Sequence, residues 1–318
     1  MPLPKLAPFI LPITRAELPG WYRLFHHFVG DGRKDDDAWR DAGWRTIRGK
    51  WHGYRMRLDL ADWSDRTTYF VGRYYETEVQ LLMRALLRRG DRFVDIGANT
   101  GMLTLLGASL VGPTGRVDAF EPNPMCCRRI RQHLLINKIR HVVLHELALG
   151  EQEGEAELHA VPHHSGFGTL APIEGEALGA FSDTHTVRVA RGERVLTADD
   201  RPLRLVKIDV EGFECQTLGG LSGVLERQRP AVICEVNPYC LERAGKSLAD
   251  LVALMGGMGY AAYEPRPVAG HWSNRLDLCR LDTQGDVHAT DLLWLHRDAG
   301  APELRGNVRL VDERAAAA

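Results

Sequence analysis

Long apolar runs are missing from this chain. No run approaches the roughly 20 residues that a membrane-spanning helix needs, because Arg, Asp or Glu interrupts every candidate. Prolines break the apolar start, which also lacks a charged leader and a clear cleavage site. We therefore expect a soluble, cytoplasmic protein without a signal peptide or a membrane span.

A charge bias and paired cysteine motifs are missing as well. The formal net charge is -2 at pH 7, so no global basic field attracts nucleic acid or an anionic membrane. The six cysteines form no CxxC pair and have no nearby histidine at zinc-finger spacing. We therefore expect buried, reduced thiols, no nucleic-acid partner and no metal site.

Short apolar runs of strand length alternate with stretches of helical period from about residue 91 onward. This alternation is typical of βαβ units and a parallel sheet. The last strand has no crossover helix after it, and it can enter the sheet antiparallel. The expected core strands cover residues 93–96, 117–121, 141–147, 205–210, 231–235, 260–263 and 292–295.

One large α/β domain over residues 86–300 accounts for this pattern. Residues 1–85 suggest a helical and hairpin extension, which we interpret as a lid over a ligand, a contact in a homodimer, or a packing appendage. Residues 301–318 suggest a C-terminal tail. Residues 155–159 and 186–189 suggest an inserted pair of strands.

A glycine turn follows the strand at 93–96 directly. Gly97 and Gly101 lie between the strand-end Asp95 and a helix, so the backbone N–H groups of the turn should face a nucleotide-type ligand. A pyrophosphate cradle needs the pattern GxGxxG, and Asn99 stands where its second glycine belongs. The turn therefore disfavours a nicotinamide dinucleotide.

Two carboxylates end adjacent expected strands. Asp95 can accept hydrogen bonds from an ammonium group, and Glu121 can accept them from the two hydroxyls of a ribose. Each acid alone could also cap the helix that follows it. Together they favour S-adenosylmethionine, which carries both groups.

Several motifs resemble those of the FkbM family of methyltransferases over about residues 70–298. The motifs DIGANTG and KIDVEG together, in this order along the chain, are specific to this family, whereas FEPNP or ALG alone would not be. The motifs are Tyr75-Glu76, DIGANTG at 95–101, FEPNP at 120–124, ALG at 148–150, KIDVEGFE at 207–214 and CEVNP at 234–238.

The resemblance implies a doubly wound, mostly parallel, seven-stranded class I methyltransferase sheet of the Rossmann-like α/β class. It also implies S-adenosylmethionine as methyl donor and S-adenosylhomocysteine as product. The cofactor residues that follow are Glu76, Asp95, Gly97, Ala98, Asn99, Gly101, Glu121, Pro122, Asn123, Glu146, Ala148 and Asp209.

The activity that the resemblance implies is O-methylation of a hydroxyl on a small molecule, such as a sugar, a lipid or a secondary metabolite. N- or C-methylation of a small molecule or peptide is an alternative with the same cofactor site. An NAD-dependent oxidoreductase and a catalytically inactive cofactor-binding protein are more distant alternatives.

Acidic residues follow two further strands, where an acceptor would lie. Asp209 and Glu211 lie where the strand at 205–210 leaves the sheet, and Glu235 ends the next strand. Ligands of open α/β sheets bind outside such strand ends, so we predict that these acids face the sulfonium and the acceptor. A helix-terminal role for Glu211 and a structural role for Glu235 are equally open.

An alcohol acceptor must lose a proton, and a histidine with a pKa near 6.5 is suited to accept it at neutral pH. His163 and His164, in a loop with glycines, are therefore the candidate bases, and His271 is a second candidate. The fold could also assemble His163 and His164 with Asp209 and Glu211 into a metal site, although the sequence shows no clear ligand pattern.

Overall fold

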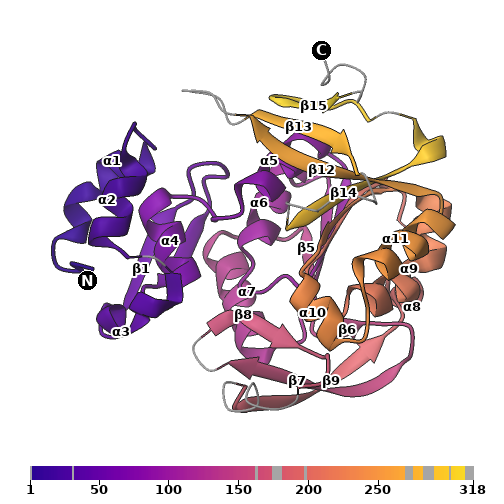
Figure 1. Cartoon of the computed structure of the whole chain (residues 1–318), viewed down its shortest axis with the longest axis horizontal. Coiled ribbons are helices and arrows are strands. Elements are labelled where there is room, and N and C mark those ends of the chain that lie inside the picture. The colour runs from indigo at the N-terminus through magenta and orange to yellow at the C-terminus, as the bar shows by residue number, and fades with distance from the viewer. Residues whose placement is uncertain are drawn as a thin grey trace.

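A computed structural model describes residues 2–30, 32–161, 164–173, 181–196, 199–268, 275–281, 290–300 and 302–311. Figure 1 shows three parts: an N-terminal unit, a large sheet flanked by helices, and a smaller sheet formed by the middle of the sequence. None of the described helices is long and apolar enough to cross a membrane. All six cysteines are described; none forms a disulfide, and five are buried.

The central sheet contains the seven predicted strands and two more, in the order β15-β13-β12-β14-β11-β10-β3-β4-β5. Five successive strands are parallel, and β14 runs antiparallel to both β11 and β12. The expected antiparallel entry of the last core strand is thus confirmed. The strands are β3 (Arg92–Ile96), β4 (Arg116–Phe120), β5 (Val142–His145), β10 (Leu203–Ile208), β11 (Ala231–Glu235), β12 (Tyr260–Val268), β13 (Arg275–Arg280), β14 (Asp291–His296) and β15 (Val308–Val311).

Two strands of this sheet differ from the sequence-based expectation. No strand was expected between residues 263 and 292, but β12 extends to Val268 and pairs with β13. The segment expected as a tail contributes β15, which pairs parallel to β13. Leu276 and Leu278 are buried and alternate with more exposed neighbours. One face of β13 therefore packs on the apolar core, which stabilises the strand in the sheet.

Helices cover both faces of the central sheet. On one face pack α5 (Thr77–Leu86), α6 (Met102–Val111) and α7 (Pro124–Ile136). On the other pack α9 (Glu214–Gln228) and α11 (Leu248–Gly257). The strands between them are apolar on both sides, as a parallel sheet between two helix layers requires.

The N-terminal unit has its own apolar cluster. It contains η1 (Ala7–Ile10), α1 (Leu11–Arg15), α2 (Trp21–Phe28), η2 (Gly32–Asp35), α3 (Asp36–Trp39), β1 (Trp44–Arg48), β2 (Arg55–Asp59) and α4 (Trp63–Val71). The predicted hairpin is confirmed as β1 and β2. Met56 and Leu58 of β2 pack against Met102 and Leu105 of α6, which attaches the unit to the core.

A smaller sheet lies beside the carboxyl ends of the central strands, below them in Figure 1. Its order is β6-β9-β7-β8, and it contains the predicted strand pair as β7 and β9. Two short helices, α8 (Gly192–Val195) and α10 (Pro238–Arg243), follow β9 and β11. The strands are β6 (Ala148–Leu149), β7 (Gly154–Val161), β8 (His164–Thr169) and β9 (Asp183–Ala190).

Candidate active site

A cavity opens at the carboxyl ends of the central strands, where the strand order changes direction between β3 and β10. It contains about 820 Å³ of empty space, part of which is open to solvent. In open doubly wound sheets, ligands bind in the crevice at this switch point. The fold therefore brings the predicted motifs to the position where a ligand is expected.

Most of the predicted site residues line this cavity. They come from the segment before α5, from the turns after β3, β4 and β10, from β6, and from the end of β11. The predicted residues in the lining are Glu76, Gly97, Asn99, Glu121, Pro122, Asn123, Ala148, Asp209, Glu211 and Glu235.

Four predicted cofactor residues lie outside the lining. Asp95 is buried beneath the glycine turn, and Ala98 and Gly101 are buried residues of the turn itself. Glu146 is exposed, and its carboxylate pairs with Arg131 on α7. The next residue, Leu147, lines the cavity instead of Glu146.

The glycine turn has a backbone shape that few side chains tolerate. Gly97 has a φ of 74°, and a Cβ atom placed there would lie 1.8 Å from the carbonyl oxygen of Asp209. Asn99 also has a left-handed backbone, with a φ of 49°. Asparagine adopts this conformation more readily than most residues. Glycine at 97 thus allows the turn and the end of β10 to approach each other closely.

The N–H groups of this turn bond within the chain, which corrects the expectation that they face the ligand. Those of Gly97 and Ala98 both donate to the carbonyl oxygen of Phe120, at 3.0 Å each. That of Asn99 donates to Glu121 Oε2 at 2.7 Å. A pyrophosphate would therefore find these donors already in use.

Asp95 supports the turn from below. Its side chain is 0% exposed, and its Oδ2 atom accepts a hydrogen bond from the Thr104 hydroxyl at 2.6 Å. Burial raises its pKa, whereas the charge of Lys207 lowers it. Asp95 therefore holds α6 against β3, and it does not reach the cavity surface.

Glu121 is held in place by the two loops beside it. Its Oε2 atom accepts the Asn99 N–H at 2.7 Å, and its Oε1 atom accepts the Asn123 N–H at 2.8 Å. Burial raises its pKa to about 7, although these two amides lower it. Each carboxylate oxygen has a further lone pair for a ligand hydroxyl.

Asp209, Glu211 and Glu235 form an acidic wall on the side of the cavity next to β10 and β11. Each offers a carboxylate oxygen that lies within 4.8 Å of the other two. Glu211 has a left-handed φ of 52°. Its carbonyl oxygen accepts hydrogen bonds from Thr169 Oγ1 at 2.8 Å and from Arg243 Nη2 at 3.0 Å. These contacts fix the turn that presents the wall.

Lys207 is the buried counter-charge below the acidic wall. Its side chain is 3% exposed, and Nζ donates to Asp209 Oδ2 at 3.0 Å and to the Gly97 carbonyl oxygen at 3.1 Å. Burial lowers its pKa, but the charges of Asp209, Asp95 and Glu76 raise it overall. Lys207 therefore stays charged and links β10 to the glycine turn.

The acids of the cavity outnumber the cations that the structure describes around it. Burial and the charge of Asp209 raise the pKa of Glu76 to about 8 and that of Glu211 to about 7. The pKa of Glu235 is also raised, by burial and by Asp209 and Glu211. A cationic ligand would relieve this repulsion.

A family model described as "Methyltransferase FkbM domain" matches residues 95–262, a span of more than half of the chain. The chain belongs to the FkbM methyltransferase family. The matched span covers the glycine turn, the acidic wall and the strands from β4 to β11. The resemblance inferred from the motifs is thus confirmed, and so is the α/β methyltransferase fold with its mostly parallel sheet.

Solved structures with some likeness to this FkbM-family chain include the methyltransferase FkbM of Methylobacillus flagellatus, with 17% identity and a TM-score of 0.39. That alignment covers 65% of this chain and 44% of the other, so this chain spans less than half of it. The precorrin-6y C5,15-methyltransferase of Geobacter metallireducens has 14% identity and a TM-score of 0.35, and the alignment covers 70% of this chain and 87% of the other. A SAM-dependent O-methyltransferase of Thermotoga maritima has 12% identity and a TM-score of 0.37, and the alignment covers 70% of this chain and 64% of the other. A search of curated proteins found no match.

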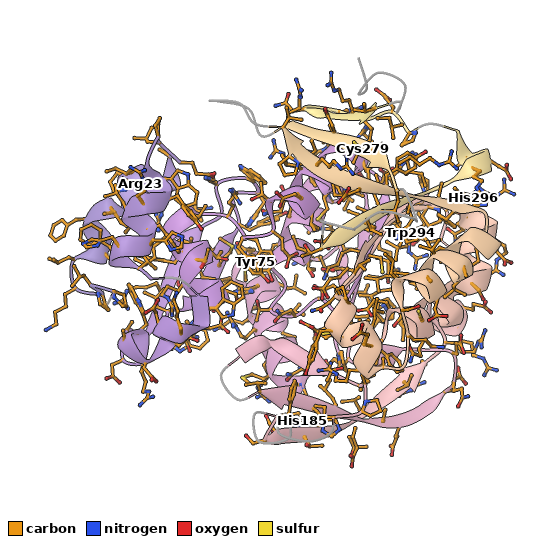
Figure 2. All side chains as sticks on the ribbon, in the orientation of Figure 1. Arg23, Tyr75, His185, Cys279, Trp294 and His296 are labelled. Atoms are coloured by element: carbon orange, nitrogen blue, oxygen red, sulfur yellow. The ribbon has the colours of Figure 1, made fainter. Side chains whose placement is uncertain are left out.

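Two tyrosines that the sequence analysis did not assign also line the cavity of this FkbM-family chain. Tyr74 and Tyr75 connect α4 to α5, and their hydroxyls lie 3.4 Å apart. Figure 2 shows Tyr75 between the N-terminal unit and the central sheet. Burial raises the pKa of both phenols, so they stay protonated donors. Their position next to Glu76 in the sequence was the available signal.

The candidate histidine bases remain predictions. His163 and His271 lie outside the described residues, and for His164 the structure describes only its place in β8. Gly166 and Gly168 of the same strand line the cavity, so β8 passes beside it.

Proposed function

We propose that this protein transfers a methyl group from S-adenosylmethionine to a hydroxyl of a small molecule, such as a sugar, a lipid or a secondary metabolite. The observation that carries this proposal is the acidic cavity at the switch point of the sheet. Its carboxylates suit a cation, and the occupied amides of the turn do not suit a pyrophosphate.

The described residues fit the parts of S-adenosylmethionine. Glu121 suits the ribose hydroxyls, because it lines the cavity and backbone N–H groups orient both of its oxygens. Apolar side chains for an adenine ring are Phe120, Leu147, Leu149 and Phe213. The backbone of Gly97 lines the cavity where the chain between ribose and amino acid would lie, and Glu76 suits the ammonium group.

The bound donor would supply a methyl group already activated by its sulfonium. The protein then has to position the acceptor in line with that methyl group, and positioning can account for much of the rate. The acidic wall accepts the hydrogen bond of an acceptor hydroxyl and orients its oxygen. Tyr74, Tyr75, Leu158 and Leu170 supply the remaining surface for a small, partly apolar acceptor.

Calorimetry with the full chain tests the donor half of this proposal. We expect binding of S-adenosylmethionine and S-adenosylhomocysteine, but not of NAD. Glu121→Gln should weaken this binding by about tenfold, which is about 1.4 kcal/mol. Glu226→Gln is the matched control, because Glu226 is exposed on α9 and should leave binding unchanged.

Binding of NAD in place of S-adenosylmethionine would contradict the proposal, as would equal effects of the two variants. Mass spectrometry of acceptors after turnover tests the other half. Addition of a methyl group to an acceptor oxygen supports the proposed O-methylation. Addition to nitrogen or carbon would support the alternative of N- or C-methylation instead.

A further inference from the structure

We propose that the acidic wall of Asp209, Glu211 and Glu235 binds one divalent cation with a preference for oxygen ligands, such as Mg²⁺ or Mn²⁺, on the acceptor side of the cavity. This proposal rests on the proposed function for its role in catalysis. Its binding site stands on the geometry of the wall alone.

The three carboxylates have the spacing of ligands around a single ion. Their nearest oxygens all lie within 4.8 Å of one another. Oxygen ligands around one Mg²⁺ or Ca²⁺ ion lie about 3 to 5 Å apart, since metal–oxygen distances are about 2.0–2.6 Å. Small side-chain rotations would therefore bring all three to one ion, and waters or an acceptor would complete its shell.

Two buried carboxylate oxygens at this place have no hydrogen-bond partner among the described residues. One is Glu235 Oε2, on the wall itself, and the other is Glu214 Oε2. Glu214 is 1% exposed, and its Oε1 atom accepts the N–H groups of Val210 and Gly212, beside the wall. A buried carboxylate oxygen without a partner is costly, and a nearby cation would offset that cost.

The neighbouring cations offset only part of the charge of this cluster. Lys207 bonds to Asp209 Oδ2 and to a backbone carbonyl oxygen. Arg243 uses Nη2 on the Thr169 hydroxyl and the Glu211 carbonyl oxygen, not on a wall carboxylate. Glu214 is a fourth acidic side chain beside the wall, since its Oε1 atom accepts the N–H groups of Val210 and Gly212.

The wall is built rigidly enough to act as a ligand set. The Glu211 side chain accepts a hydrogen bond from Cys240 Sγ at 3.2 Å. Gly212 follows it with a φ of 103°, and a Cβ atom there would lie 2.5 Å from the Cys240 carbonyl oxygen. Asp209 is fixed from below by Lys207. Ligands held in this way bind a metal with little loss of side-chain entropy.

A cation at this wall would define the acceptor class. It would hold two neighbouring oxygens of an acceptor, such as a vicinal diol, and lower the pKa of the hydroxyl that reacts. The proton would pass to solvent, and the new oxygen–carbon bond would form as the carbon–sulfur bond of the donor breaks. The electron pair of that broken bond stays on sulfur, so the step balances without another co-reactant.

The direct test measures Mn²⁺ binding by electron paramagnetic resonance on the full chain, after treatment with a chelator and without donor or acceptor. We expect one bound Mn²⁺ per chain, displaced by Mg²⁺. Glu235→Gln and Asp209→Asn should each weaken binding by about tenfold or more. Glu242→Gln is the control, because Glu242 is exposed on the adjacent α10 and should bind Mn²⁺ like the wild type.

The test has two ways to overturn the proposal. Absence of Mn²⁺ binding overturns it, and so does binding that Glu235→Gln, Asp209→Asn and Glu242→Gln all leave unchanged. Glu235→Gln keeps the side-chain volume and replaces a carboxylate that has an unpartnered buried oxygen, so thermal unfolding should confirm that this variant is folded.

Calorimetry on the same samples separates this inference from the proposed function. Binding of S-adenosylmethionine without Mn²⁺ binding overturns the metal site alone. Binding of Mn²⁺ without S-adenosylmethionine overturns the proposed function and leaves the metal site supported. With both bound, turnover should favour acceptors with adjacent hydroxyls over matched single-hydroxyl compounds, and equal turnover would overturn the acceptor class.

Discussion

Gly97 lacks a side chain where the glycine turn meets the end of β10, so the carbonyl oxygen of Asp209 can occupy the space that a Cβ atom would need. The left-handed φ of 74° adds a second cost for any other residue. We expect Gly97→Ala to lower the free energy of unfolding by more than about 2 kcal/mol. The measurement is the urea-unfolding midpoint of the full chain.

Gly256 offers the matched control for this substitution. It lies in α11, and no atom stands within 4 Å of a Cβ atom placed there. Gly256→Ala should stabilise the chain by about 0.5–1 kcal/mol through helix propensity. Equal midpoints for the two variants would show that the close approach at Gly97 carries no cost.

The direction of single side chains in the site could not be predicted from the sequence. Asp95 and Glu121 both end strands, yet only Glu121 lines the cavity, because Asp95 turns toward Thr104 on α6. The motif indicates a strand end, and the side-chain direction depends on tertiary contacts. The same holds for Glu146, which turns outward to Arg131.

Strands β3, β4 and β5 are joined by a buried ionic cluster around Asp118 of β4. Asp118 is 0% exposed and bonds to Arg92 Nε at 2.8 Å on β3 and to His145 Nε2 at 3.0 Å on β5. Arg116 adds a contact at 2.7 Å from the same strand. Burial raises the pKa of Asp118, but these partners lower it well below its usual range.

The sign of the pH dependence follows from that lowered pKa. The charged form of Asp118 stabilises the folded state fully above its unfolded-state pKa of about 4, and this contribution is lost as the pH falls toward the lower folded-state value. We expect Asp118→Asn to cost about 3–5 kcal/mol at pH 7, because it leaves Arg92 buried without its carboxylate.

Urea unfolding of wild type and Asp118→Asn between pH 7 and pH 3 measures this difference directly. It should shrink as the pH falls below about 4. Carboxyls with raised pKa values, such as Glu121, change in the opposite sense, but they are common to both proteins. A difference that stays constant with pH would argue against the buried cluster.

Among the elements, the regular pattern made the core predictable. Apolar strands such as β3 and β10 alternate with helices of clear period, and the structure confirms them. The hairpin of β12 and β13 was missed because prolines at 265 and 267 suggest a loop. They lie in the part of β12 that continues beyond its pairing with β14 and pairs with β13 alone. The short β15 is added by tertiary pairing alone.

At the scale of the whole molecule, the N-terminal unit is tied to the cavity by one bidentate ion pair. Glu17 accepts Arg73 Nε at 3.0 Å and Nη2 at 2.9 Å, and Arg73 is followed directly by Tyr74 and Tyr75 of the lining. Burial raises the pKa of Glu17, but Arg73 and Lys50 lower it overall. The unit therefore holds one edge of the cavity.

We expect Glu17→Ala to lower stability by about 1–3 kcal/mol and to weaken S-adenosylmethionine binding by about threefold or more. Thermal unfolding and calorimetry measure the two effects. Asp37→Ala is the control, because its pair with Arg40 is exposed and should contribute little. If Glu17→Ala behaves like Asp37→Ala, the N-terminal unit does not position the cavity edge.

The role of residues 1–85 could not be derived from sequence, because helical spacing does not reveal which surface a helix covers. The structure packs the hairpin on α6 and brings Tyr74 and Tyr75 to the cavity. The lid and homodimer interpretations stay predictions.

The amides of the glycine turn have a consequence for the water in the cavity. Since those of Gly97, Ala98 and Asn99 already bond to Phe120 and Glu121, they hold no water that an entering ligand would have to displace. The floor of the cavity therefore adds little desolvation cost to binding, and water is retained chiefly by the carboxylates around it.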